Sequence, residues 1–325
     1  MTIPEPTSAT GIGPQGGDRI PVFAGLGCYL AWGLLPILFI WAGRVGAGAF
    51  EIVAWRTIWS LPCVAALVFI TGQAASLRRL RPSTWAALAL SSFLIAVNWS
   101  TYVWAVSAGR TISASLGYYI LPLLNMAAGA VLFEERISRT GWIAVALAAT
   151  GVGLQGLALG EFPWVSVVLA LSFCGYGIVR KKAAVEAQVG LLVECLILFA
   201  PAVAYTVWLS HNGHGVFGVT PAATGLLMLC GPATVLPLAL FAFAARRLPL
   251  SVMGFLQFIS PTLQFMVGFE AGESLTPLRI LSFGFIWAGV LTFAGQLWFA
   301  RAGARKAVLQ TASPNYLKGT TRRPY

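Results

Sequence analysis

The sequence predicts an all-α integral membrane protein with ten transmembrane helices, arranged as two inverted five-helix repeats. The composition is the first observation: of 325 residues, 58% are hydrophobic and 10% are charged, a balance outside the range of soluble domains. The second is a series of ten apolar runs, each long enough to cross about 30 Å of hydrocarbon as a helix. The third is a pattern of polar and small residues that occurs once in each half of the chain.

The apolar runs define the predicted spans in chain order. The expected spans are residues 20–42, 50–70, 84–108, 112–133, 141–159, 162–179, 189–208, 221–245, 250–270 and 279–300. Five of them fall in the first predicted repeat, residues 20–160, and five in the second, residues 161–300. Residues 1–19 are predicted to be a disordered cytoplasmic N-terminus, and residues 301–325 a basic cytoplasmic tail.

Two sets of four residues indicate the duplication. Within each set the steps are four, three and four residues, so on a helix all four side chains share one face. The sets are Tyr118, Pro122, Asn125 and Gly129 and, 139 residues later, Gln257, Pro261, Gln264 and Gly268. Other matches, in the same order, are Arg110 with Arg247, Gly117 with Gly254, Glu135 with Glu273, and Gly151 with Gly289. Because each unit of about 140 residues holds an odd number of spans, we expect the second to be inverted, as in many secondary transporters.

The basic residues alternate with the spans. Of 21 Lys and Arg residues, 17 fall on one side of the predicted bilayer, whereas the other side carries only Arg44, Arg110 and Arg279. The positive-inside rule therefore places both termini in the cytoplasm. Since the net charge of +11 resides mainly in short connections and the tail, we expect no nucleic-acid partner.

Two ionisable residues lie inside predicted spans, where a charge costs about 2.5 to 3.5 kcal/mol or more. Arg56 in the second span either attracts an anionic or carboxylate-bearing substrate or has a structural role, capping helix carbonyls or reaching outward. Glu194 in the seventh span either binds a cation or a proton, which makes it the proton-coupling candidate, or bonds to a neighbouring helix. Glu135 and Glu273, at span ends, are predicted to anchor nearby basic groups or backbone.

Uncharged polar residues complete the predicted site. The candidate substrate-binding residues beside Arg56 are Asn98, Tyr118, Asn125, Gln257 and Gln264. An amide such as that of Asn98 also fits an interhelical hydrogen bond, so both interpretations stay open. The stripes on the fourth and ninth spans favour the wall of a polar cavity, because each combines polar side chains with a kink-forming proline, Pro122 or Pro261. A packing seam would account for the glycine and proline alone.

The remaining features argue against catalysis and cofactor binding. The five cysteines lie inside apolar runs at spacings that fit neither a disulfide framework nor a zinc site, and no histidine falls inside a span. We therefore expect no metal, no cofactor and no enzymatic activity. Small residues at Ala149, Gly153, Gly284 and Gly289 are predicted to support close helix contacts on the fifth and tenth spans. Such contacts form within one chain or between two, which leaves a homodimer as an alternative.

Five sequence runs carry a family resemblance: EIVAWRTIWS, VNWSTYVWAV, ASLGYYILPLLN, RKKAAVEAQVGLLVE and GFLQFISPTL. In this order they closely resemble the RarD proteins of the EamA group, in the drug/metabolite transporter superfamily. The resemblance implies a permease of the bacterial inner membrane, with two inverted five-helix units around a central cavity. The positions that match the family pattern are Arg56, Asn98, Trp99, Gly117, Tyr118, Pro122, Asn125, Glu186, Glu194, Gln257 and Pro261. Leu121 and Glu134 depart from it, where the family tends to have Asn and Gly.

These observations together predict a secondary transporter, embedded in the lipid bilayer, that moves a small organic solute by alternating access. Arg56 would fix a carboxylate or other acceptor on the solute, and Glu194 would support proton-coupled export. The alternative is an uncoupled facilitator or channel for small solutes, which the same polar stripes would line.

Overall fold

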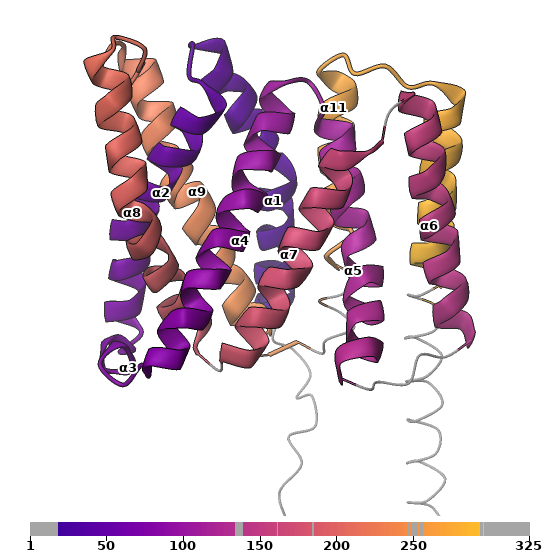
Figure 1. Ribbon diagram of the computed structural model, residues 1–325, viewed down its shortest axis with the longest axis horizontal. Helices are drawn as coiled ribbons and strands as arrows, with labels where there is room; N and C mark the ends of the chain where they lie inside the picture. The colour runs from indigo at the N-terminus through magenta and orange to yellow at the C-terminus, as the bar shows by residue number, and fades with distance from the viewer. Residues whose placement is uncertain are drawn as a thin grey trace, which may run out of the picture.

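The computed structural model of the chain is a bundle of long helices that run up and down in alternation (Figure 1). It describes residues 19–133, 139–160, 162–183, 185–245, 247–248, 253, 256–292 and 295. Within these residues the chain forms helices and connecting turns and no strand. The predicted basic tail and nearly all of the predicted N-terminal segment lie outside the described residues.

Each predicted span corresponds to one helix of the described chain. The helices are α1 Ile20–Arg44, α2 Ala49–Ile70, α3 Ala74–Leu77, α4 Pro82–Ser107, α5 Thr111–Phe133, α6 Arg139–Leu159, α7 Trp164–Ala183, α8 Ala187–His211, α9 Pro221–Ala245, α11 Ile259–Glu270 and an unlabelled helix, Pro277–Thr292. Six of these, α1, α2, α4, α6, α8 and α9, are long and apolar enough by themselves to cross a membrane. The predicted fold class, an all-α integral membrane protein, is confirmed. The short helix α3, which follows α2, was not predicted.

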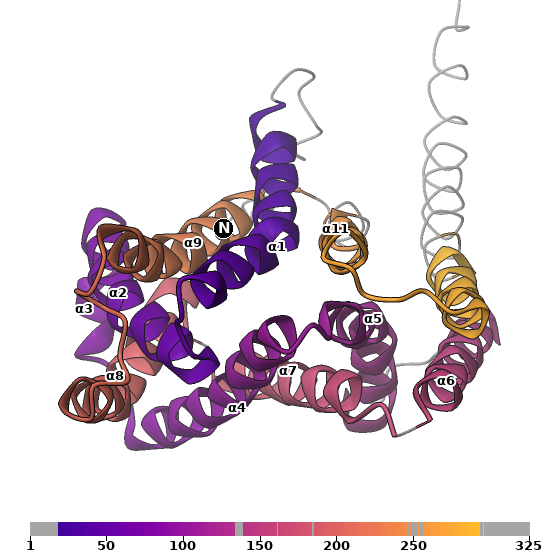
Figure 2. The same cartoon turned by 90° about the horizontal axis from the view of Figure 1, so that it is seen from above.

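The packing of the helices is reciprocal between the two predicted repeats. In the predicted repeats α1 corresponds to α7, α4 to α9, and α5 to α11. The observed partners follow this correspondence: α4 packs against α7 while α9 packs against α1, and α5 packs against α7 while α11 packs against α1. The pair α2 and α8, which correspond to each other, are also in extensive contact. The bundle therefore consists of two interlocked sets of helices, seen from above in Figure 2.

Helix α6 and the last described helix, Pro277–Thr292, form a separate pair at the edge of the bundle (Figures 1 and 2). Glycines bring their backbones together: a Cβ on Gly151 would lie 2.8 Å from the carbonyl oxygen of Ser282, and one on Gly289 2.8 Å from that of Ala144. Gly151 and Gly289 are equivalent in the predicted repeats, so the contact is reciprocal and within one chain. Gly153 and Gly284 meet nothing within 4 Å, and the homodimer stays a prediction.

Two carboxylates hold connections to helix ends: Glu51, which is buried, and Glu273, which is partly buried. Glu273 accepts hydrogen bonds from the backbone N–H groups of Thr111 and Ile112, at the start of α5. Glu51 accepts one from the backbone N–H of Val216, at 2.9 Å, after α8. Both satisfy amide groups that would otherwise lack partners. The prediction that Glu273 anchors backbone is confirmed, whereas Glu135 lies outside the described residues.

Candidate functional site

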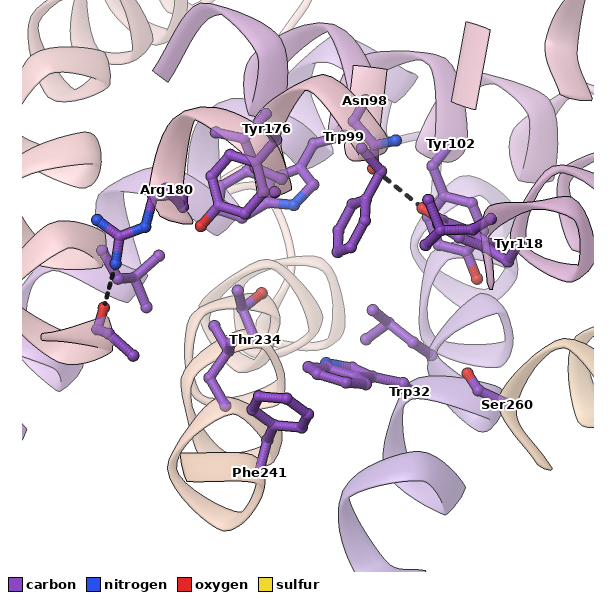
Figure 3. A pocket seen from close by; sticks show the side chains of 18 of the residues that line it. Trp32, Asn98, Trp99, Tyr102, Tyr118, Tyr176, Arg180, Thr234, Phe241 and Ser260 are labelled. Carbon is purple, nitrogen blue, oxygen red and sulfur yellow. Dashed lines mark hydrogen bonds between the residues drawn. The ribbon is translucent and has the colours of Figure 1, made fainter. Parts of the chain in front are cut away.

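A cavity of about 570 Å³ opens between the two sets of helices (Figure 3). This volume lies in the range of small-molecule sites. Its aromatic lining residues are Tyr29, Trp32, Trp99, Tyr102, Tyr118, Phe173, Tyr176 and Phe241. Its polar lining residues are Arg56, Asn98, Tyr102, Tyr118, Tyr176, Arg180, Gln188, Thr234, Gln257, Ser260 and Gln264. The lining is therefore rich in aromatic rings and in hydrogen-bonding groups at once.

Arg56 on α2 is buried in this wall, with 5% of its surface exposed. Its Nε donates a 2.7 Å hydrogen bond to the hydroxyl of Thr234 on α9. The guanidinium carbon lies 4.2 Å from the centre of the Trp99 ring and 5.6 Å from that of Phe39, distances at which a cation attracts an aromatic face. Its Nη1 has no hydrogen-bond partner, and no carboxylate pairs with Arg56 among the described residues. The charge is thus held in place without being neutralised.

The contact between α2 and α9 that places Thr234 beside Arg56 depends on Gly231. A Cβ at Gly231 would overlap the backbone of Trp59, so only glycine allows α9 to approach α2 this closely. Thr234 follows one turn later on the same helix and donates its hydroxyl hydrogen to the carbonyl of Cys230, at 2.8 Å. Its oxygen is therefore free to accept from Arg56.

Asn98 on α4 lines the cavity, and its side chain is already engaged. The amide nitrogen donates to the carbonyl oxygen of Leu169 and to the hydroxyl of Ser172, both at 3.0 Å and both on α7. The amide oxygen accepts a 3.0 Å hydrogen bond from the hydroxyl of Tyr118, the dashed line beside Tyr118 in Figure 3. Asn98 therefore joins three helices and orients Tyr118.

Tyr102, one turn after Asn98, was not among the predicted site residues. Its hydroxyl is buried and has no hydrogen-bond partner in the part of the chain that the structure describes. Its ring lies edge-on to Tyr118 at 5.5 Å and to Phe39 at 6.0 Å between ring centres. The position one helical turn from Asn98 was the only sequence signal for it.

The ninth predicted span, which includes α11, forms the wall of the cavity opposite Asn98 and Tyr102. Gln264 donates from Nε2 to the carbonyl oxygen of Trp32 and to the hydroxyl of Ser260, both at 3.3 Å, while its Oε1 is buried without a partner. Gln257 lines the cavity from a turn just before α11. Pro261 lies in the first turn of α11, where a missing N–H costs nothing, and its role as a helix kink stays a prediction. The side chains of Pro122 and Asn125, on α5, lie outside the described residues.

Glu194 on α8 lies behind the cavity lining, with 1% of its surface exposed. It accepts hydrogen bonds from Ser91 on α4, at 2.6 Å, and from Tyr176 on α7, at 3.2 Å. It also pairs with Arg180 on α7, with 3.6 Å between Nε and the carboxylate oxygen. Glu194 therefore bonds to neighbouring helices, as one of the two interpretations expected. Among the described residues, Tyr176 and Arg180 both contact Glu194 and line the cavity, and so connect the two.

Arg180 begins the basic run Arg180-Lys181-Lys182 directly after the predicted span 162–179, among the basic residues that the sequence places on the cytoplasmic side. In the structure α7 continues through Arg180, and its side chain faces the cavity. Its Nη2 donates to the carbonyl oxygens of Glu186, at 3.4 Å, and Ala187, at 3.2 Å, at the start of α8. Gly190 makes room for this guanidinium, since a Cβ there would overlap it.

Comparisons with known proteins show which proteins this chain is similar to. The sequence model of the EamA-like transporter family matches residues 19–156. An uncharacterized transporter of Pseudomonas aeruginosa is 42% identical over 282 residues, which cover 84% of this chain and 93% of the relative. Protein RarD of Streptomyces exfoliatus is 35% identical over 313 residues, 94% of this chain and 98% of that protein. A protein of known crystal structure, 17% identical, has a TM-score of 0.58 over 84% of this chain and 96% of that one, and supports the fold alone.

Proposed function

The chain belongs to the RarD proteins of the EamA-like transporter family, and we propose that it moves a small organic anion across the bacterial inner membrane by alternating access. It is a multi-pass membrane protein of the transporter class. In the proposed orientation both termini lie in the cytoplasm, as the distribution of Lys and Arg predicts.

The observation that carries the proposal is the state of Arg56. A buried charge without a counter-charge costs several kcal/mol, so a protein retains one where a partner arrives from outside. Arg56 is held on one side by Thr234 and Trp99, while Nη1 is left without a partner in the cavity wall. A carboxylate or similar anion on the solute would complete its hydrogen bonds, because the guanidinium fork matches two oxygen atoms.

The other predicted residues either contact the solute or form the wall around it in this proposal. Gln264 and Gln257 would contact the solute from the opposite wall, the first through its unpartnered Oε1. Tyr118 would form part of the wall near the anion, in the orientation that Asn98 imposes. Asn125 stays a predicted contact. The reciprocal packing of α4 on α7 and of α9 on α1 supports alternating access, because two similar halves can exchange conformations around one site.

The test is uptake of labelled organic anions by proteoliposomes that contain the full chain, with Arg56→Gln compared with wild type. We expect saturable uptake by wild type and a loss of about 100-fold or more in kcat/KM for Arg56→Gln, since removing one partner of a buried charge pair costs about 2 to 5 kcal/mol. Arg44→Gln, an exposed arginine at the end of α1, is the matched control and should behave as wild type. Saturable uptake that Arg56→Gln leaves unchanged would remove Arg56 from the site, and no uptake at all would contradict transport of this solute class.

Proton coupling through Glu194 is the second part of the proposal. The groups that face Glu194 are Ser91 from α4, Tyr176 and Arg180 from α7, and the adjacent Cys195 on α8. A proton on Glu194 would remove the charge that pairs with Arg180 and so loosen the junction of α7 and α8. We expect Glu194→Gln to abolish the response of uptake to an imposed pH gradient while the protein still folds. Wild-type uptake that never exceeds the solute gradient, with or without a pH difference, would indicate the uncoupled facilitator instead.

A further inference from the structure

Positive charges outnumber negative charges around the cavity, and this excess limits which solutes can bind. Two guanidinium groups line it, and no carboxylate does among the described residues. One of them, Arg180, is already paired with Glu194 behind the wall. The other, Arg56, has only neutral partners. The described site as a whole therefore carries one positive charge in excess and is complementary to a single negative charge.

Two unpartnered donors lie on the same side of the cavity. The Nη1 of Arg56 and the hydroxyl of Tyr102 are both buried and both lack a hydrogen-bond partner. Arg56 is 5% exposed and Tyr102 is 4% exposed, and both line the cavity. Both side chains pack against the ring of Phe39, at 5.6 Å from the guanidinium carbon and 6.0 Å from the tyrosine ring centre. An anion between them would accept one N–H and one O–H hydrogen bond, which would remove both unsatisfied groups.

Aromatic rings form the wall opposite these donors. Tyr29, Trp32 and Phe241 contact one another, with ring centres 5.7 to 6.4 Å apart. Figure 3 shows Trp32 and Phe241 across the cavity from Asn98, Trp99 and Tyr102. Large rings of this kind bury the apolar part of a ligand and stack on planar groups. The cavity thus has one end suited to an anion and one suited to a ring.

An ammonium group finds no complementary site in this arrangement. Glu194 lies behind the lining, where Tyr176 and Arg180, both of which bond to it, separate it from the cavity. The unpartnered Oε1 of Gln264 is a neutral acceptor, which satisfies a hydroxyl or amide hydrogen but does not offset a positive charge. A substrate cation would also lie in the same cavity as the unneutralised Arg56. The free energy of binding an α-ammonium group is therefore unfavourable here.

We propose that the cavity binds aromatic monocarboxylates that lack an ammonium group, and that Tyr102 is a substrate-binding residue that donates to the carboxylate beside Arg56. This inference rests on the proposed transport function, whose substrate class it narrows. It separates this site from one built for amino acids, in which a carboxylate or a set of carbonyl groups must receive the ammonium.

Three related phenyl compounds test the selectivity: 3-phenylpropanoate, phenylalanine and phenethylamine, which lacks the carboxylate carbon. Binding to the full chain in detergent is measured by quenching of tryptophan fluorescence, and uptake is measured in proteoliposomes. We expect 3-phenylpropanoate to bind about tenfold or more tightly than phenylalanine, and phenethylamine not to bind saturably. Hexanoate, which has the charge without the ring, should bind about tenfold more weakly than 3-phenylpropanoate.

The variant Tyr102→Phe tests the second donor, because it removes the hydroxyl and keeps the ring. Its affinity for 3-phenylpropanoate should fall about tenfold, the effect of one hydrogen bond to a charged group. Tyr205→Phe, on α8 and outside the cavity lining, is the matched control and should leave the affinity unchanged. An unchanged affinity in Tyr102→Phe would overturn the assignment of Tyr102.

The outcomes separate this inference from the proposed function. Binding of 3-phenylpropanoate without uptake would support the anion site and contradict transport. Uptake of phenylalanine as efficient as that of 3-phenylpropanoate would support transport and overturn the selectivity. Equally efficient uptake of phenethylamine, a cation, would overturn both the selectivity and the proposed anionic solute. If none of the compounds bound to folded wild-type protein, the selectivity would be overturned as well.

Discussion

Two arginines face one cavity, and the structure holds them in opposite ways. Arg56 contacts a hydroxyl and two aromatic rings, none of which carries a charge. Arg180 contacts the carboxylate of Glu194 and two carbonyl oxygens at the start of α8. The location of the counter-charge decides what each can do. In the proposed site Arg56 pairs with an anion from outside, whereas Arg180 already pairs with Glu194 and joins α7 to α8.

A glycine lies beside each arginine, and the two glycines differ in what they permit. Gly231 brings the backbone of α9 against the backbone of α2 near Arg56. Gly190 makes room for a side chain, the guanidinium of Arg180. Backbone in a packed bundle cannot move aside without disturbing the helices, but the end of an arginine side chain can. The Arg56 region is therefore expected to be rigid and the Arg180 region to be adjustable.

Gly231→Ala should lower the stability of the protein more than any other substitution considered at these two sites. The added Cβ would overlap the backbone of Trp59, so α2 and α9 must separate. We expect a destabilisation of about 1 to 3 kcal/mol or more and a clear fall in the midpoint of thermal unfolding, measured by tryptophan fluorescence in detergent. Gly225→Ala, on the same helix and with nothing within 4 Å of the added Cβ, should retain the wild-type midpoint. Equal midpoints for the two variants would show that the contact is not tight.

The next effect is that of Thr234→Val, which keeps the shape of the side chain and removes the acceptor of the Arg56 hydrogen bond. The guanidinium would then be held by Trp99 and Phe39 alone, and its Nε would lack a partner. We expect the affinity for an organic anion to fall about 5- to 20-fold, measured by equilibrium binding in detergent, because the arginine is less well oriented. Thr206→Val, on α8 and outside the cavity lining, controls for loss of a buried hydroxyl. An unchanged affinity in Thr234→Val would indicate that the aromatic rings suffice.

The sequence allowed the helices and Arg56 to be predicted because both follow from composition along the chain. Apolar runs locate spans, and a lone charge within one is conspicuous. Arg180 was not predicted, because a basic run at a span end resembles a solvated loop, and only the continuation of α7 directs its first residue inward. The use of Asn98 to bond α7 was likewise open, since an amide serves a helix contact and a ligand equally well until its partners are known. Pattern therefore predicts position, whereas the role of each polar group depends on which neighbours have already satisfied it.

Gly190→Ala should change stability less than the other variants. It tests the contacts of Arg180. The added Cβ would displace the guanidinium from Glu194 and from the carbonyl oxygens of Glu186 and Ala187. Because the displaced group is flexible and alanine favours helix by about 1 kcal/mol over glycine, we expect the unfolding midpoint to change little.

Local opening is the property that should respond to Gly190→Ala. Hydrogen exchange of backbone amides at the start of α8 should rise about fivefold or more, while exchange in α2 around Arg56 and the KM for uptake stay within about twofold of wild type. Gly153→Ala on α6, with open space around the added Cβ, controls for the effect of alanine itself. Unchanged exchange would mean that Arg180 does not join α7 to α8. A large change in KM would mean that Arg180 binds the solute as Arg56 does, and the contrast between the two arginines would fail.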